Sequence, residues 1–169
     1  MILGPEMKST GEVMGIDNSF EIAYLKSQIA AGQKLDNIKN IFISIKDDDK
    51  EEISSYAQLL QENNFNLFTT RGTFDFLADK GIKSNLVNKV AEGSPHVVEY
   101  IKDNKIDLVI NTTENKQAIK DSFTIRRTSV DLSIPYSTNL RSSKILIKSI
   151  ISHKKNEISV KAIQNHHNN

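Results

Sequence analysis

Short apolar runs alternate along the chain with longer segments in which apolar residues recur at helical spacing. The clearest run, IDLVINTT at residues 106–113, is almost wholly apolar and then turns abruptly polar. Such a run is typical of a strand that is buried on both faces. Four further runs share its β-branched and aromatic character. The predicted strands are residues 40–45, 65–70, 85–90, 106–113 and 134–138.

Between these runs the apolar positions follow the period of a helix that buries one face. Ser19 is a suitable N-cap for the first of these helices, and Gly32 is a suitable stop. Asp47 to Asp49 suit a helix N-terminus, where carboxylates complement the helix dipole. Pro95 occupies an early helical position, where its missing N–H costs little. The predicted helices are residues 19–31, 47–63, 73–80, 95–105, 115–128 and 139–152.

The alternation of strands and helices predicts a parallel sheet that is covered by helices on both faces. An eight-stranded barrel typically needs roughly 250 residues, so about five strands in ~150 residues indicate an open, doubly wound sheet. In such sheets, ligands bind beyond the carboxyl ends of the strands. The residues that follow each strand are therefore the first place to look for chemistry.

Composition narrows the class of protein. The chain has 169 residues and a net charge of +1, which argues against general binding to nucleic acids or anionic membranes. Cysteine is absent, so disulfides and thiolate metal sites are excluded. The sequence has neither a membrane-spanning apolar run nor a signal peptide, and we expect a cytoplasmic protein.

The predicted strand ends carry hydroxyl, amide and ammonium groups, which bind phosphate and ribose. The segment TTRGT at residues 69–73 follows the second strand, and its Gly72 permits close approach of a ligand to the backbone at a helix start. Lysine side chains after the first strand and on the third would supply positive charge. The candidate phosphate-binding residues are Lys50, Thr70, Gly72, Thr73 and Lys89, with Asn111 and Thr113 at the end of the fourth strand.

Plainer interpretations exist for each of these residues alone. Thr70 and Thr73 could be helix caps, Lys50 a solvated lysine, and Asn111 part of a turn. Their joint position at one edge of the sheet favours a binding site. We expect these groups to lie at strand ends outside the core, so that replacing them changes folding stability little.

Motifs along nearly the whole chain resemble, in order and spacing, the C-terminal part of the carbamoyl-phosphate synthase large subunit. They are STGEVMGID (9–17), KSQIAAG (26–32), IFISIKDDDK (41–50), TTRGT (69–73), NKVAEGSPH (88–96), IKDNKIDLVINTT (101–113), DSFTIRR (121–127) and IPYSTNL (134–140). The resemblance implies a methylglyoxal-synthase-like fold, a three-layer α/β/α sandwich around a five-stranded parallel sheet. It also implies an allosteric domain that binds nucleotide monophosphates of the UMP or IMP type.

By the same resemblance, Lys50, Thr70, Thr73 and Lys89 match phosphate-side positions, and Asn111 and Thr113 match positions nearer the ribose and base. Tyr136 and Thr138 match a segment linked to the activator ornithine, which in relatives lies between this domain and its neighbour. Phe74 replaces a smaller residue that is usual after this type of TRGT motif, which leaves the identity of the effector open.

The resemblance places the chain in a larger ligase, as an excised piece of it. Its expected partners are the rest of the large subunit and a glutaminase small subunit, with possible self-association. The parent would use ATP with magnesium or manganese, whereas this chain is expected to need no cofactor and to be itself noncatalytic. Residues 1–16 would be a lead-in from the preceding domain, residues 17–153 the regulatory domain and residues 154–169 a polar tail.

Three alternatives remain. A catalytic methylglyoxal synthase needs a carboxylate base, but this chain has EGSPH where that family has a Gly-Gly-Asp segment, and NTT where it has Trp-Asp-Pro. The cyclohydrolase domain of the bifunctional purine enzyme shares the fold, but its Lys-Thr-Leu-His-Pro-type motif is missing. A purely structural oligomerisation module is the third.

Overall fold

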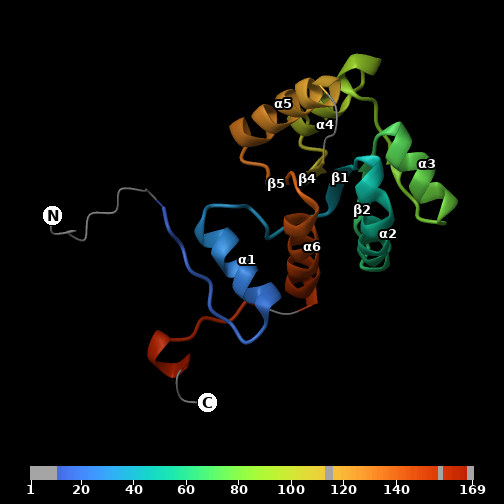
Figure 1. Ribbon diagram of the computed structural model, residues 1–169. Coiled ribbons are helices and arrows are strands. Elements are labelled where there is room, and N and C mark those ends of the chain that lie inside the picture. Colours follow the sequence, from blue (N-terminus) through green and yellow to red (C-terminus); the bar gives the residue numbers. More distant parts are fainter. Residues whose placement is uncertain (1–10, 113–115, 156–157, 167–169) are drawn as a thin grey trace.

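A computed structural model describes residues 11–112, 116–155 and 158–166 of the chain (Figure 1). The strands are β1 (Asn40–Ser44), β2 (Asn66–Thr69), β3 (Asn85–Leu86), β4 (Leu108–Asn111) and β5 (Tyr136–Ser137). The α-helices are α1 (Phe20–Ala30), α2 (Asp47–Glu62), α3 (Arg71–Asp79), α4 (Val97–Lys102), α5 (Lys116–Asp131) and α6 (Leu140–Lys155). Two short 3₁₀ helices are η1 (Val90–Glu92) and η2 (Ile163–His166).

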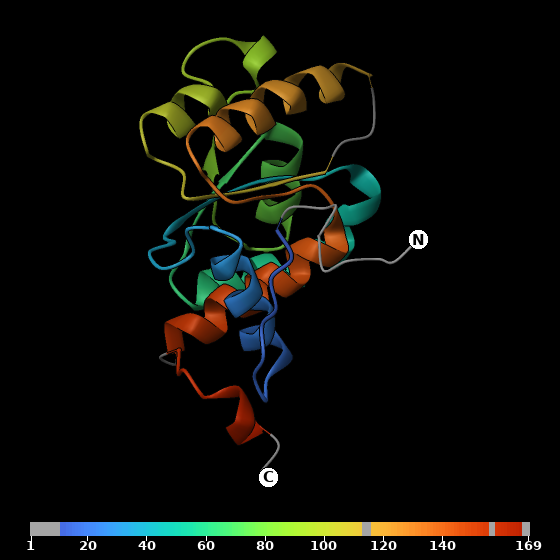
Figure 2. The same ribbon diagram turned by 90° about the vertical axis from the view of Figure 1, so that its left-hand side faces the viewer.

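The five strands form one parallel sheet in the order β3-β2-β1-β4-β5. Helices α4 and α5 lie on one side of this sheet, and α1, α2 and α6 lie on the other (Figures 1 and 2). The predicted α/β fold with a five-stranded parallel sheet in three layers is therefore confirmed. Of the helices in the described ranges, none is both long and apolar enough to cross a membrane.

Successive side chains of the central strand β1 pack in two separate hydrophobic cores, one on each face of the sheet. Ile41 and Ile43 join the cluster that contains residues of α1, α2, α3 and α6. Phe42 points the other way and packs in the cluster with residues of α4 and α5. This alternation follows from the two-residue period of a strand. Because both faces are apolar, β1 is fixed at the centre of the sheet.

The third strand is shorter than the sequence predicts. Residues 85–90 read as one strand, but β3 covers only Asn85 and Leu86, because the chain then turns into η1. The prediction that Lys89 lies in the third strand is therefore wrong. Lys89 is the N-cap of η1, and its backbone N–H donates to the Glu92 carboxylate at 2.7 Å. As an edge strand, β3 has a single neighbour to hold it in register.

Helix boundaries differ from the predictions by a few residues. Helix α3 begins at Arg71 and not at Thr73, so the whole RGT segment lies in its first turn. Pro95 is not in α4, because His96 is the N-cap of that helix. Helices α5 and α6 both continue about one turn further than expected, to Asp131 and Lys155. The Ser19 N-cap of α1 is confirmed, since its hydroxyl accepts from the Ile22 N–H at 3.4 Å.

The segment before α1 runs along that helix. Lys26 of α1 forms an ion pair with Asp17 at 2.7 Å and donates to the Ile16 carbonyl at 3.2 Å. Gly15 packs so tightly that a methyl group built on it would overlap the Ala23 carbonyl and lie 2.8 Å from the Ser27 nitrogen. The absence of a side chain at Gly15 therefore allows this segment to lie against α1.

Replacing Gly15 with alanine is expected to detach residues 11–16 from α1, because helix backbone cannot move aside for the added methyl group. Loss of about 1.4 kcal/mol of local contact would make this segment open on the order of tenfold more often. Limited proteolysis would measure the change, with Val13→Ala as a control, since Val13 is exposed. Equal cleavage of the two variants would contradict the prediction.

Candidate functional site

Hydroxyl groups join the ends of β1 and β2. These two strands are neighbours in the sheet, so the residues that follow them meet at its carboxyl edge. The Ser44 and Thr70 hydroxyls lie 3.0 Å apart, and the Thr73 hydroxyl accepts a hydrogen bond from the Ile45 N–H at 3.2 Å. The three hydroxyls therefore connect the loop after β1 to the start of α3.

Two sequence-based interpretations of the threonines are corrected by this geometry. Thr70 occupies the N-cap position of α3, but its side chain makes no capping hydrogen bond and contacts Ser44 instead. Thr73 is only 2% exposed, so it belongs to the packed interior and not to an open strand end. A side chain with that burial and a buried backbone partner contributes to stability. The expectation that Thr73 lies outside the core is wrong, and we therefore expect its removal to lower the folding stability.

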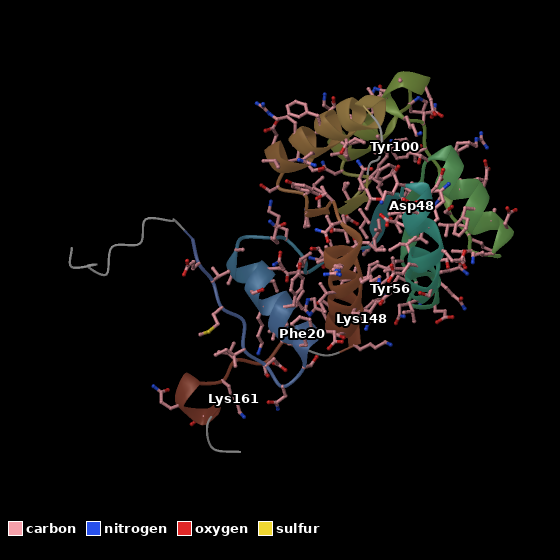
Figure 3. All side chains as sticks on the ribbon, in the orientation of Figure 1. Phe20, Asp48, Tyr56, Tyr100, Lys148 and Lys161 are labelled. Atoms are coloured by element: carbon pink, nitrogen blue, oxygen red, sulfur yellow. The ribbon has the colours of Figure 1, made fainter. Side chains whose placement is uncertain are left out.

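The first turn of α3 carries free donors beside a lysine. The Thr73 N–H donates to the Thr70 carbonyl at 2.9 Å, so Arg71 and Gly72 carry the amides of this turn that lack an intrahelical acceptor, and the Thr70 hydroxyl does not cap them. A methyl group built on Gly72 would lie 3.4 Å from the Lys50 ammonium nitrogen. Lys50 thus crosses from the first turn of α2 to that of α3. Figure 3 labels Asp48 at the end of α2 that lies beside α3.

A carboxylate shares this position with Lys50. The Lys50 ammonium lies 2.6 Å from the Asp47 carboxylate, one helical turn earlier. Its hydrogen bond and its charge hold the pKa of Asp47 below the ordinary value, and the charge of Lys89 adds a smaller effect in the same direction. Lys89 therefore favours the ionised form of Asp47, even though it lies outside β3.

The end of β4 adds an amide and a further hydroxyl. Asn111 is buried beside Ser44 in the β1–β4 register, and its amide donates to the Ser122 hydroxyl of α5 at 3.2 Å. The Thr112 hydroxyl accepts from the Lys46 N–H at 3.0 Å. Thr113, the other residue expected here, lies outside the described residues.

Sequence reasoning missed the structural roles of Ser44 and Thr112. Both lie near the ends of predicted strands. A hydroxyl group at such a position is the one sequence feature that could have indicated a hydrogen bond between strand ends. The partners of Ser44 and Thr112 depend on which strands are adjacent, and that information comes only from the sheet order.

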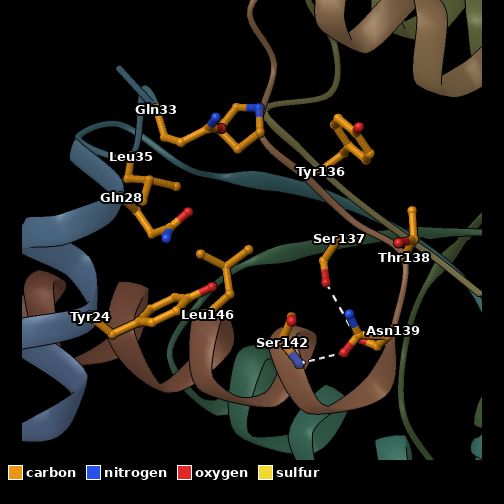
Figure 4. A pocket seen from close by; sticks show the side chains of 11 residues that line it. Tyr24, Gln28, Gln33, Leu35, Tyr136, Ser137, Thr138, Asn139, Ser142 and Leu146 are labelled. Carbon is orange, nitrogen blue, oxygen red and sulfur yellow. Dashed lines mark hydrogen bonds between the residues drawn. The ribbon is translucent and has the colours of Figure 1, made fainter. Parts of the chain in front are cut away.

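Tyr136 and Thr138 lie away from the residues around Lys50 and Gly72. They line a cavity of about 280 Å³ between α1, β5 and α6, together with Tyr24 and Gln28 of α1. Figure 4 shows Tyr24 and Gln28 facing Ser142 and its neighbours across this space. The structure therefore brings Lys50, Thr70, Gly72 and Thr73 together, whereas Tyr136 and Thr138 form a second group.

The residue types at the first site suit an oxyanion. A hydroxyl that accepts one hydrogen bond can still donate its own proton, and helix N-termini and ammonium groups both favour negative charge. Among the described residues, no three histidines, cysteines or carboxylates come together in a way that could hold a metal ion. The groups described at this site therefore suit an anion.

Comparison with known proteins agrees with the fold. Residues 52–138 match the family model of the MGS-like domain. The carbamoyl phosphate synthase large chain of Myxococcus xanthus is 49% identical over 97% of this chain, which covers 15% of that relative. The C-terminal section of the large chain from Methanopyrus kandleri is 44% identical over 98% of this chain and 31% of that relative.

Among solved structures, the methylglyoxal synthase of Elizabethkingia anophelis resembles this chain with a TM-score of 0.51. The likeness covers 66% of this chain and 78% of that protein at 19% identity, and it supports the fold alone. The family match begins inside α2 and ends just after β5, so it contains TTRGT and the end of β4 but neither Lys50 nor the end of β1. The chain belongs to the MGS-like domain family and is similar over nearly its whole length to the MGS-like section of carbamoyl phosphate synthase large chains.

Proposed function

We propose that this chain is a noncatalytic regulatory domain that binds a nucleotide monophosphate at the carboxyl ends of β1, β2 and β4. The observation that carries the proposal is the convergence of Lys50, Thr73 and the uncapped first turn of α3. The 5′-phosphate would lie over Gly72, with Lys50 and Lys89 as its cations. Asn111, and the polar residues that follow it, would lie nearer the ribose and base.

The larger protein in the proposal is a carbamoyl phosphate synthase large chain, as in the relatives. The rest of that chain and a glutaminase subunit would be its partners, and ATP with its metal would bind outside this chain. We also propose that the cavity near β5 contributes to an ornithine site. Within the part of the chain that the structure describes, its lining holds amides, hydroxyls and apolar groups but no charged side chain. A charged amino acid would therefore need carboxylates from outside this group of residues.

Replacing Lys50 with alanine is expected to weaken the binding of UMP about tenfold or more. A hydrogen bond to a charged group contributes roughly 1.5–3 kcal/mol, and 1.4 kcal/mol is a factor of ten. Calorimetric titration of the chain would measure the affinity. Lys80→Ala is the matched control, because Lys80 carries the same charge at the opposite end of α3. Uridine, which lacks the phosphate, should bind far more weakly than UMP.

Other functions predict other results. Equal affinity of wild-type protein and the Lys50→Ala variant would contradict the phosphate site. Failure of the wild-type chain to bind UMP, IMP or phosphate would favour a structural module. Turnover of dihydroxyacetone phosphate that is lost on mutating the site would indicate a lyase and contradict the noncatalytic role. That reaction needs a positioned carboxylate base, whereas the carboxylate nearest to Lys50, Asp47, is held in an ion pair.

A further inference from the structure

The Lys50 ammonium is already occupied by a group of the protein itself. The Asp47 carboxylate lies 2.6 Å from it, and the exposed fractions of the two side chains are 83% for Asp47 and 17% for Lys50. The carboxylate is thus open to solvent, whereas the lysine side chain that it contacts is largely buried. Lys50 in turn lies against Gly72, at the first turn of α3.

Asp47 interacts with both candidate cations of the phosphate site. Lys50 and, more weakly, Lys89 favour its ionised form. An anion that binds over Gly72 would compete with this carboxylate for the same charges. It would also be repelled by the carboxylate if Asp47 stayed in place, because like charges at such short range disfavour each other.

We propose that Asp47 is an internal counter-ion that a phosphate ligand must displace from Lys50, so that Asp47 sets the affinity of the site. The inference rests on the proposed function and adds to it a contact that opposes binding. Without ligand, the ion pair partly neutralises the site. With ligand, the phosphate takes the place of the carboxylate, and Asp47 turns to solvent, to which it is already exposed.

The chain offers a matched pair of substitutions to test this contact. Asp47 and Asp48 are adjacent in the first turn of α2 and both are exposed, but Asp48 lies 3.7 Å from Lys46 and makes no ion pair with Lys50. Asp47→Asn and Asp48→Asn remove the same charge from the same helical turn. Only the first releases Lys50.

Calorimetric titrations with UMP and with inorganic phosphate would compare wild-type protein, Asp47→Asn, Asp48→Asn and Lys50→Ala. Asp47→Asn is expected to bind both ligands roughly two- to fivefold more tightly. This range corresponds to the energy that an exposed ion pair typically contributes. Asp48→Asn should change the affinity less than twofold. In a protein that already carries Lys50→Ala, Asp47→Asn should increase the affinity less than it does in wild-type protein, because the two side chains act as a pair.

The outcomes separate this inference from the function on which it rests. If Lys50→Ala weakens binding but Asp47→Asn does not strengthen it, the site stands and the counter-ion role is overturned. An equal gain from Asp48→Asn would also overturn it, since general charge would then explain the effect. If neither wild-type protein nor any variant binds either ligand, both proposals fall. Tighter binding by Asp47→Asn alone supports both.

Discussion

Replacing Phe42 with alanine is expected to lower the free energy of unfolding by about 3–5 kcal/mol. Phe42 lies in β1, the central strand of the sheet, and is fully buried in the core beneath α4 and α5. Its strand neighbours Phe68 and Val109 are held by backbone pairing on either side. They cannot move inward to fill the cavity, so the cost should lie near the upper end of the range.

Urea denaturation followed by circular dichroism would measure this effect. Phe123→Ala is the matched control, because Phe123 on α5 is 65% exposed and its loss should change stability by no more than about 0.5 kcal/mol. Domains of this size are stabilised by about 5–15 kcal/mol in total, so the Phe42 variant should unfold at a clearly lower urea concentration. Similar midpoints for the two variants would contradict the assignment of the core.

The layered fold could be predicted because its signals are local and repeated. β1, β2 and β4 lie in apolar runs, and each is followed by a helix of suitable period. The sequence predicts too long a third strand, because the apolar pattern of residues 85–90 does not reveal that this edge strand stops pairing after Leu86. There the backbone leaves β2, and Asn88 instead pairs with His96. Such a choice depends on tertiary contacts and not on local sequence.

The site was predicted as a set of residues but not as a set of contacts. Carboxyl ends of parallel strands meet at one edge, which is why Lys50, Thr70 and Thr73 could be grouped in advance. Which groups their side chains contact depends on the strand order and on rotamers. The Thr73–Ile45 hydrogen bond crosses from α3 to the end of β1. The Asp47–Lys50 pair competes with the predicted ligand, and no strand pattern reveals that competition.

Replacing Thr73 with valine is expected to lower both folding stability and nucleotide affinity. Valine keeps the shape of the side chain but removes the hydroxyl, so the buried Ile45 N–H loses its acceptor. An unsatisfied buried donor costs roughly 1–3 kcal/mol. If the hydroxyl also donates to the phosphate, its loss should weaken UMP about tenfold or more, because hydrogen bonds to charged groups contribute about 1.5–3 kcal/mol.

The two effects of Thr73→Val can be separated by measurement. Thr73→Ser is the matched control, because it retains the hydroxyl and should preserve most of the affinity. Melting curves would give the loss of stability, and UMP titration at a temperature where the variant is fully folded would give the affinity. A variant that loses stability but binds UMP like wild-type protein would assign Thr73 a purely structural role. The phosphate site would then depend on Lys50 and the amides of α3, since the Thr73 hydroxyl would serve only to hold Ile45.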